Sequence, residues 1–451
     1  MKFSYLWLRD LVEGFDSPPQ EVMRLITTKT AECEGMEPAG ADYAIEVDNK
    51  SLTHRPDLWG HYGMARELAA IAGKRLRDPV AKRPIEDAPS PMRVEVEDFA
   101  LCPRYSALVF ENVTVRPSPD WLRQRLETAG LNPIGNIVDV TNFVMAELAQ
   151  PMHAFDAEKL HGGKIIVRAA RAGEKIAALN GESYDLDPSN LVIADPQGAI
   201  AIAGVIGGAG SAISESTTRI VLESANFNAS SIRKTSARLK LRTDASMRFE
   251  KAQDPVNTVR ALKRALELLE RVSPGIRLIG GLADEYRPLA ARGPIELPLD
   301  WLDRKLGRAI PADEVKQILE SLEFRIEQKS HRVFSVHVPS WRATKDVTMK
   351  DDLVEEVGRM VGYDSIAPEA PRTPAIVPPA NPERALHHLV REMAAAQGFT
   401  EVYNYSFIGE DQARIFGLKN MIEVANPISS DQTLLRPSLL PGIYKNIRDN
   451  W

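Results

Sequence analysis

The 451-residue sequence has little cysteine and no long hydrophobic run, and each shortage excludes a class of protein. Two cysteines, Cys33 and Cys102, are too few for a disulfide framework or a four-cysteine zinc site, so we expect a reducing compartment, the cytoplasm. No segment approaches the ~18 consecutive apolar residues of a membrane span. The first residues carry scattered charges and no small-residue cleavage site, unlike a signal peptide. No membrane association is therefore expected.

Common catalytic and cofactor-binding motifs are also absent from the sequence. It contains no serine nucleophile elbow, Cys–His nucleophile signature, Walker loop, Rossmann fingerprint, His-Glu-x-x-His or EF-hand loop. The eight histidines are not grouped as metal ligands. The net charge of −6 disfavours indiscriminate binding to nucleic acid but allows a local basic patch.

The length and two proline-rich stretches predict several domains. A chain of 451 residues is too long for a single core, and 44% hydrophobic with 26% charged residues is the composition of a globular protein. Linkers are expected around residues 75–95 and 368–382, where prolines cluster. The predicted fold class is multidomain α+β. The expected domains are a helical N-terminal region (1–84), an α+β domain (85–290), a winged-helix-like unit (291–366) and the start of a further domain (381–451).

Hydrophobic periodicity predicts the elements of the first two domains. Residues 1–80 are expected to form helices alone, with Asp57 as the N-cap of a helix over 58–72 and Gly73 as its C-terminal stop. The turn 54–57 is either functional or, more simply, a capping and packing turn. Within the α+β domain, the expected strands are 94–96, 107–113, 165–169, 191–193 and 220–222, and the expected helices are 120–129, 230–239 and 255–272.

The third unit has two predicted helices, 299–306 and 311–322, followed by a hairpin of strands 324–327 and 334–338. This order is winged-helix-like. It occurs in DNA-reading domains and also in plain packing modules, and the second interpretation is favoured. In the last segment we expect a helix over 383–397 and a strand over 401–407.

The stretch 139–156, DVTNFVMAELAQPMHAFD, has a helical apolar pattern with polar residues at both ends. Thr141 and Asn142 lie where the apolar run begins, and Pro151 prevents the helix from continuing. His153 follows two residues later. Because polar groups at a helix end and on the following turn converge easily, this stretch predicts the rim of a pocket more than a piece of core.

Two further features could belong to the same pocket. Gly204, Gly207, Gly208 and Gly210 indicate either close approach of the backbone to another group or a tight turn. Glu223 ends the buried-looking strand over 220–222, so its carboxylate must be exposed at the strand end, paired or functional. A purely structural glutamate remains an open interpretation.

Two clusters of charge have both a functional and a structural interpretation. Five cations within ten residues suit a phosphate backbone but also a solvated helix face; they are Arg233, Lys234, Arg238, Lys240 and Arg242. Four carboxylates without histidine or cysteine suit a hard cation such as Mg²⁺ but also a solvated acidic helix; they are Asp346, Asp352, Glu355 and Glu356.

Several long motifs make the chain similar to β subunits of the bacterial-type phenylalanine–tRNA ligase family, over essentially its whole length. They are HRPDLWGHYGMARELAA, DVTNFVMAELAQPMHAFD, GVIGG, LESANF with SIRKTSARLKLRTDASMRFEKAQDP, DLVEEVGRMVGYD and NPISSDQTLLRPSLLPG. The resemblance implies an α2β2 enzyme that joins phenylalanine to tRNA(Phe) with ATP. The α subunit then carries the aminoacylation and ATP site, while the β subunit contributes a class II catalytic-like domain without active-site residues.

The same resemblance implies roles and partners for the other parts. The unit 291–366 is similar to a family domain with a DNA-binding type of fold, although no DNA is expected as a partner. The quartet Asp346, Asp352, Glu355 and Glu356 matches the family's magnesium positions, with the ion shared with the α subunit. The expected partners are the α subunit and tRNA(Phe).

The α+β domain resembles the family's editing domain, which hydrolyses tyrosine mistakenly attached to tRNA(Phe). An apolar pocket rejects an isostere that only adds a hydroxyl by about 10²-fold at best, so a second site is required. By motif, Glu223 accepts a hydrogen bond from the tyrosine hydroxyl, and His153 orients the attacking water or the ribose end, without a covalent intermediate. The matching residues are His153, Glu223, Thr141, Asn142 and Thr243 for catalysis, and Pro151, Gly204 and Ala245 for substrate binding.

Two departures from the family pattern are visible. The oligonucleotide-binding β-barrel that the family commonly inserts after the first helices is absent, because residues 32–42 lead straight to AIEVDNKSLTHRPD. Family members also continue well beyond the LLRPSLLPG motif. Two alternatives from other classes therefore stay open, a non-catalytic tRNA-binding or scaffolding paralogue and a free-standing trans-editing hydrolase.

Overall fold

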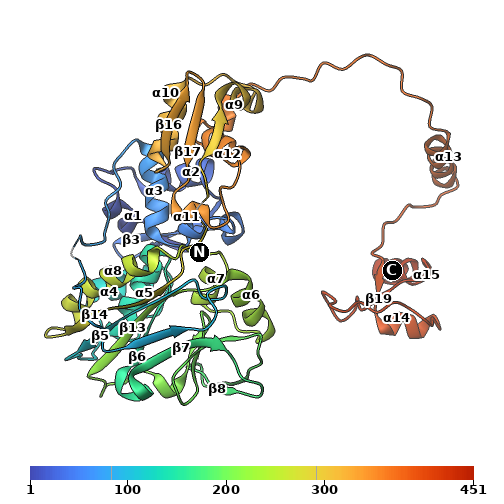
Figure 1. Ribbon diagram of the computed structural model, residues 1–451. Helices are drawn as coiled ribbons and strands as arrows, with labels where there is room; N and C mark the ends of the chain where they lie inside the picture. The colour runs from blue at the N-terminus through green and yellow to red at the C-terminus, as the bar shows by residue number, and fades with distance from the viewer. Residues whose placement is uncertain (83, 291) are drawn as a thin grey trace. The chain divides into compact units, whose positions relative to one another are not determined.

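The N-terminal region combines helices with a three-stranded antiparallel sheet in the computed structural model, which describes residues 1–82, 84–290 and 292–451 (Figure 1). The strands are β1 (Lys2–Ser4), β2 (Cys33–Ala39) and β3 (Asp42–Val47), in the order β1-β3-β2, and the helices are α1 (Tyr5–Leu11), α2 (Pro19–Lys29) and α3 (His61–Ala72). The prediction of helices alone is therefore wrong. β2 and β3 form a hairpin that turns at Gly40 (φ 64°), so no barrel is inserted between them, as the sequence predicts.

The start of α3 differs from the prediction. Gly60 takes the N-cap position, and a Cβ there would lie 2.4 Å from the backbone nitrogen of Ala149. Asp57 lies one turn earlier, in the 3-10 turn η2 (Pro56–Trp59), where its carboxylate accepts hydrogen bonds from Arg55 instead of capping a helix. Gly73 ends α3 with a φ of 62°, which confirms the predicted stop.

Two sheets build the α+β domain. The first has the order β14-β5-β13-β6 and is antiparallel throughout; the second has the order β12-β11-β10-β7-β4, with β4 and β7 parallel. The strands are β4 (Arg93–Val96), β5 (Arg104–Glu111), β6 (Met152–Asp156), β7 (Lys164–Ala169), β10 (Leu191–Ala194), β11 (Ala199–Ile202), β12 (Ile206–Gly207), β13 (Arg219–Asn226) and β14 (Arg277–Tyr286), with a small hairpin of β8 (Lys175–Ala177) and β9 (Ser183–Asp185). The helices are α4 (Asp120–Thr128), α5 (Asn136–Leu148), α6 (Ala229–Arg238), α7 (Asp244–Phe249) and α8 (Asn257–Val272). The strands and helices predicted in this domain are confirmed within a few residues.

The first sheet has two different buried faces. Leu108, Phe110 and Leu222 pack into one hydrophobic core together with residues of α5 and α8, which lie over this sheet in Figure 1. Val221 packs into a second core with residues of the other sheet. Because side chains alternate along a strand, Glu223 shares the face of Val221. The carboxylate of Glu223 therefore lies on the face of the first sheet that packs against the second sheet.

The third unit contains β15 (Ile295–Pro298), α9 (Leu299–Leu306), α10 (Ala312–Ser321), β16 (Arg325–Ser330), β17 (Val333–His337), α11 (Ser340–Ala343) and α12 (Lys350–Val361). Both predicted helices and the hairpin are confirmed. A third strand, β15, pairs with β17 and was not predicted, because it has four residues and ends in Pro298. Leu302, Leu319 and Phe334 fill the core of this unit.

The chain as a whole divides into two compact parts, Met1–Pro368, which includes the third unit, and Glu369–Trp451. The second contains α13 (Pro382–Ala396), β18 (Phe407–Ile408), α14 (Glu410–Ile415), β19 (Leu434–Leu435) and α15 (Leu440–Asn450). The helix over 383–397 is confirmed. The prediction of a strand over 401–407 is wrong, because only Phe407 and Ile408 pair with another strand, β19. In the described part of the chain, no helix has the length and apolar character needed to cross a membrane.

Candidate functional site

A cavity of about 630 Å³ opens in the α+β domain. All eight pocket residues expected from the sequence lie in its wall; they are Thr141, Asn142, Pro151, His153, Gly204, Glu223, Thr243 and Ala245. Helix α5, strands β6 and β13, and the start of α7 supply most of them. The volume lies within the range of about 300–1,000 Å³ that small-molecule sites occupy. Residues from distant parts of the sequence therefore share one cavity.

Strand pairing places His153 beside Glu223. The two residues stand directly opposite each other in the antiparallel ladder of β6 and β13, so their side chains lie on the same face. Glu223 lies inside β13 and not at its end, because the strand continues to Asn226; the predicted strand end is wrong. Only 5% of Glu223 is exposed, so exposure at a strand end does not explain this carboxylate.

The Glu223 carboxyl is buried without a full set of partners. Its Oε2 atom is shielded from solvent and has no hydrogen-bond partner among the described residues. Burial raises the pKa of Glu223 to about 8, and the nearby Tyr105 hydroxyl opposes this shift only in part. Glu223 is therefore mainly neutral at pH 7, and a neutral carboxyl both donates and accepts hydrogen bonds.

His153 is neutral as well. Burial lowers its pKa to about 4, and its Nε2 atom has no hydrogen-bond partner in the described part of the chain. The ring packs edge-on against Phe155, with 4.5 Å between the ring centroids. The backbone at Gly207 lies so close that a Cβ there would stand 2.7 Å from Nε2. Packing on two sides fixes the ring and leaves Nε2 shielded from solvent without a hydrogen-bond partner among the described residues.

The end of α5 forms the pocket rim that the sequence predicts. The helix stops at Leu148, and Ala149 follows in the left-handed region with a φ of 60°. Gln150 then holds the turn, because its Nε2 donates to the carbonyl oxygens of Pro151 (3.0 Å) and Ala225 (2.8 Å). The chain can therefore reverse into β6 within a few residues.

Two of the predicted catalytic hydroxyls have structural partners. The Thr243 hydroxyl donates to the Val205 carbonyl (2.8 Å) and accepts a hydrogen bond from the backbone N–H of Ser246 (3.1 Å), so it caps α7. The Thr141 hydroxyl donates to the Val138 carbonyl (2.7 Å). These bonds fix both side chains in the cavity wall, and catalytic roles for them stay predictions.

Close backbone approach is found at three of the four glycines. Gly204 has a φ of 65°, and a Cβ there would lie 3.0 Å from Phe249. A Cβ at Gly208 would lie 2.5 Å from the Ile200 carbonyl oxygen, and Gly207 contacts the His153 ring as described. Gly210, by contrast, faces open space. The approach is to other protein groups that shape the cavity.

Two titratable residues near Glu223 escaped the sequence analysis. Tyr105 is fully buried on β5, and its hydroxyl has no hydrogen-bond partner within the described residues. Burial, together with the Glu223 charge, raises the pKa of Tyr105 and of Cys102. Nothing in the sequence places either residue near Glu223, because Tyr105 has the pattern of a core position in strand β5 and Cys102 lies in the segment just before that strand.

The predicted magnesium ligands do not converge. Asp352 accepts hydrogen bonds from two backbone N–H groups and caps α12, and Glu355 is exposed. Asp346 and Glu356 both accept from Arg342. In the ranges that the structure describes, no group of three or more His, Cys, Asp or Glu side chains could hold a metal ion. Carboxylates that already neutralise a guanidinium do not fit Mg²⁺ as they lie.

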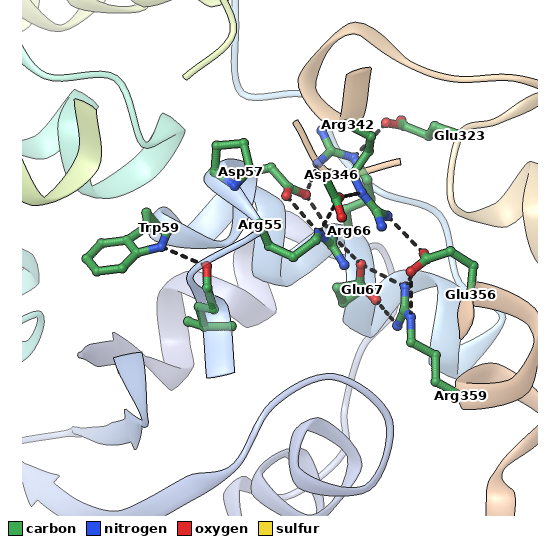
Figure 2. A network of polar contacts seen from close by, with 12 residues as sticks. Arg55, Asp57, Trp59, Arg66, Glu67, Glu323, Arg342, Asp346, Glu356 and Arg359 are labelled. Atoms are coloured by element: carbon green, nitrogen blue, oxygen red, sulfur yellow. Dashed lines mark hydrogen bonds and ion pairs between the residues drawn. The ribbon is translucent and has the colours of Figure 1, made fainter. Parts of the chain in front are cut away.

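Asp346 and Glu356 instead belong to a buried cluster, the arginine network (Figure 2). Its members are Arg55, Asp57, Arg66, Glu67, Glu323, Arg342, Asp346, Glu356 and Arg359. Arg359 donates from Nη1 to Glu67 (2.6 Å) and from Nη2 to Glu356 (2.7 Å). Arg55 donates from Nη2 to Asp57 (2.9 Å) and to Glu67 (2.6 Å). The network thus joins η2 and α3 to α12 of the third unit.

The arginine charges dominate the protonation of this network. Burial alone would raise the pKa of Asp57, but Arg55 and its neighbours outweigh burial and lower that pKa to about 2. Arg342 and Arg359 likewise hold the pKa of Glu356 well below its usual value. Asp346 is the exception, because burial outweighs its arginines and raises its pKa. The turn 54–57 is therefore explained by ion pairing and packing.

Three protein-family models match consecutive parts of the chain. The B3/4 domain matches residues 101–274, the tRNA synthetase B5 domain matches 295–363, and the phenylalanyl tRNA synthetase beta chain CLM domain matches 366–451. The first match contains all eight cavity residues, and the second contains the acidic quartet.

Curated relatives carry the name phenylalanine–tRNA ligase beta subunit. The protein from Solibacter usitatus is 66% identical over 418 residues, which cover 92% of this chain and 54% of the relative. The protein from Fusobacterium nucleatum is 40% identical over 400 residues, 88% of this chain and 50% of the relative. The chain spans about half the length of the curated relatives it matches.

Among solved structures, an N-terminal fragment of the phenylalanyl-tRNA synthetase β-subunit from Pyrococcus horikoshii is similar at 17% identity, with a TM-score of 0.47. The similarity covers 80% of this chain and 99% of the fragment.

Proposed function

The chain belongs to the family of phenylalanine–tRNA ligase β subunits, and we propose that its α+β domain hydrolyses tyrosine mistakenly esterified to tRNA(Phe). One observation carries the proposal. The carboxyl of Glu223 is buried and mainly neutral at pH 7, and its Oε2 lacks a partner among the described residues, in the wall of a cavity large enough for an amino acid. A protein rarely keeps such a group unless something else satisfies it.

Glu223 selects tyrosine in this proposal. A phenolic hydroxyl in the cavity forms the hydrogen bond that Oε2 lacks, whereas phenylalanine leaves the carboxyl unsatisfied at a cost of about 1–3 kcal/mol. Sites built to hydrogen-bond a substrate hydroxyl reject the analogue without it by as much as about 10⁴–10⁵-fold. The correct product, phenylalanyl-tRNA, therefore escapes hydrolysis.

Water is the nucleophile in the proposed reaction. Its oxygen bonds to the ester carbonyl carbon, the bond from that carbon to the ribose oxygen breaks, and the ribose hydroxyl leaves with a proton. His153 orients the water through Nε2 and does not take its proton, because a group with a pKa of about 4 is a weak base at neutral pH. Asn142 and Thr141, in the cavity wall, are the proposed contacts for the ester end. No covalent enzyme intermediate is required.

The remaining functions of the family are proposed for the assembled protein. We assign ATP-dependent attachment of phenylalanine to an α subunit, with this chain as its β partner in an α2β2 complex that binds tRNA(Phe) in the cytoplasm. An inert scaffold would leave the unpartnered atoms of Glu223 and His153 unexplained, so the scaffolding alternative is not favoured. A free-standing hydrolase would use the same cavity without the α subunit.

Deacylation of tyrosyl-tRNA(Phe) and phenylalanyl-tRNA(Phe), by the chain alone and with an α subunit, tests the proposal. We expect hydrolysis of the tyrosyl ester, and we expect Glu223→Leu to reduce the preference for tyrosine by about 100-fold or more. Glu158→Gln, which changes an exposed carboxylate, serves as the control. A Glu223→Leu protein with the parent's preference would overturn the assignment, and tyrosyl hydrolysis without an α subunit would favour the free-standing hydrolase.

A further inference from the structure

A second cavity, of about 870 Å³, lies beside the pocket and is lined mainly by charged and polar side chains. We propose that this basic cleft binds the phosphodiester backbone of single-stranded RNA, and so holds the RNA whose esterified end enters the pocket. The inference rests on the proposed function for the identity of the RNA. Its evidence, the arrangement of charge around the cleft, is separate from that of Glu223.

Cations from several segments converge on the basic cleft. Arg233 lies on α6, Lys240 and Arg242 on the loop before α7, and Lys251 just after α7. Lys345 comes from the third unit, two residues beyond α11. Of the five cations that the sequence places between residues 233 and 242, three line the cleft, and two others join them from elsewhere in the chain. A solvated helix face would not bring in the cations from outside this segment.

The positive charge of the basic cleft is only partly neutralised. Among the described residues that line the cleft, the one carboxylate is that of Glu250, which lies 2.7 Å from Lys251 and 3.8 Å from Arg242. In the part of the chain that the structure describes, Arg233, Lys240 and Lys345 take part in no ion pair. Burial lowers the pKa of Lys345, and the like charges of Lys251 and Arg233 lower it further, although the carboxylates of Glu250 and Asp346 oppose this shift in part. A bound polyanion would relieve this repulsion.

One loop separates the basic cleft from the pocket. Lys240 and Arg242 line the cleft, and Thr243 and Ala245, the next residues along the chain, line the pocket. Successive Cα atoms are about 3.8 Å apart, so the two walls meet within a few residues. A strand lying in the cleft therefore reaches the pocket mouth without a long gap.

The lining favours recognition of the RNA backbone and not of its bases. Lysine and arginine are the commonest residues of the wall, and among its described residues there is no phenylalanine, tyrosine or tryptophan to stack on a base. Phosphate contacts give binding that is independent of sequence and weakens steeply with salt. An acidic protein segment would also meet these cations, but the adjacency of the cleft to the pocket favours RNA.

The test uses the whole chain and short single-stranded RNA that carries no amino acid, with binding measured by fluorescence anisotropy at several salt concentrations. The cleft variant combines Arg233→Gln, Lys240→Asn and Lys345→Gln; asparagine is chosen because position 240 has a φ of 52°. The control combines Lys305→Gln, Lys316→Gln and Lys329→Gln on the third unit, at side chains that are 51%, 46% and 52% exposed.

We expect the cleft variant to bind RNA about tenfold more weakly or worse, with a shallower salt dependence and no change in sequence preference. The control triple should bind as the parent does. Equal RNA affinity in the cleft variant and the parent, an equal loss in the control, or tighter binding of polyglutamate than of RNA by the parent would each overturn the proposal. Because all three substituted side chains are exposed, folding should be unaffected. If the triple variant is unstable, the single change Lys345→Gln tests the proposal instead, and it should give a smaller loss of RNA affinity.

The experiments distinguish failure of the basic-cleft proposal from failure of the editing proposal. Loss of RNA binding in the cleft variant, in a chain that shows no tyrosyl-ester preference, would sustain the basic cleft and reject the editing function. Tyrosine-selective hydrolysis with unchanged RNA binding in the cleft variant would reject the basic cleft alone.

Discussion

The pocket and the arginine network both bury carboxyl groups, and they treat them in opposite ways. In the network, arginines surround Asp57 and Glu356 at hydrogen-bond distance, and their pKa values fall despite burial. In the pocket, Glu223 lacks an arginine partner among the described residues and its pKa rises to about 8. A carboxyl that the fold satisfies stabilises structure, whereas one that the fold leaves unsatisfied is available to a ligand.

The same comparison changes the meaning of the acidic quartet. Its spacing alone suggests a magnesium site, but guanidinium groups already occupy the positions where a cation would bind Asp346 and Glu356. Arg359 and Arg55 tie these carboxylates to Glu67 on α3. Asp346 and Glu356, two members of the quartet, therefore connect the third unit to the N-terminal region in this structure.

The largest expected effect comes from breaking the arginine network. Arg359→Met leaves Glu67 and Glu356 buried with too little positive charge, and removal of one partner of a buried ion pair costs about 3–5 kcal/mol. Urea unfolding should show this loss in the free energy of unfolding. Arg24→Met removes an exposed pair with Glu21 and should leave the free energy of unfolding nearly unchanged. Equal effects of the two changes would mean that the network contributes no more than surface charge.

A smaller effect is expected from the pocket, with a definite sign. The pKa of Glu223 is about 8 in the folded chain and near 4.5 when unfolded, so the folded state keeps a proton that the unfolded state releases. Stability should therefore fall as pH rises between these values, by about 1.4 kcal/mol per unit or roughly 3 kcal/mol from about pH 5 to pH 7. Glu223→Gln should remove this slope.

The difference between the parent and Glu223→Gln isolates this one group, since the other titrating groups are shared. Thermal or urea unfolding at several pH values measures it. Parallel stability curves for the two proteins would contradict a raised pKa of Glu223.

The smallest effect is the acid sensitivity of Asp57. Its pKa is about 2 when folded and 3.8 when unfolded, so its contribution to stability is complete above the unfolded value. About 2 kcal/mol should be lost as the pH falls through the folded value. The advantage of the parent over Asp57→Asn should therefore shrink below about pH 4. A gap between the parent and Asp57→Asn that stays constant with pH would contradict the lowered pKa.

Local signals mark only some of the pocket residues, whereas Thr243 and Ala245 are expected only from the resemblance to the family. Pro151 ends a helical pattern, and the glycines around 204–208 indicate close contacts. The pairing of His153 with Glu223 joins two strands far apart in the chain, and periodicity within either strand carries no information about it.

In the arginine network, local spacing suggests a metal site that the tertiary fold does not form. Asp346 and Glu356 have the spacing of metal ligands, and only the tertiary fold brings Arg55 close to Asp346. The N-terminal sheet was also missed, because β1 has three residues and β2 contains Gly35 and Pro38, which local propensity disfavours in strands. Long-range contacts decide each of these cases.

The protonation state of Glu223 tests the comparison most directly. Carbon-13 NMR of the chain labelled at the glutamate side-chain carboxyls, titrated from about pH 4 to pH 10 and compared with Glu223→Gln, resolves this one group by difference. We predict a carboxyl resonance that titrates near pH 8 and disappears in the variant. If the resonance lost in the variant titrates near the ordinary glutamate value of about 4.3, Glu223 is charged at neutral pH, and the contrast between the pocket and the arginine network is wrong.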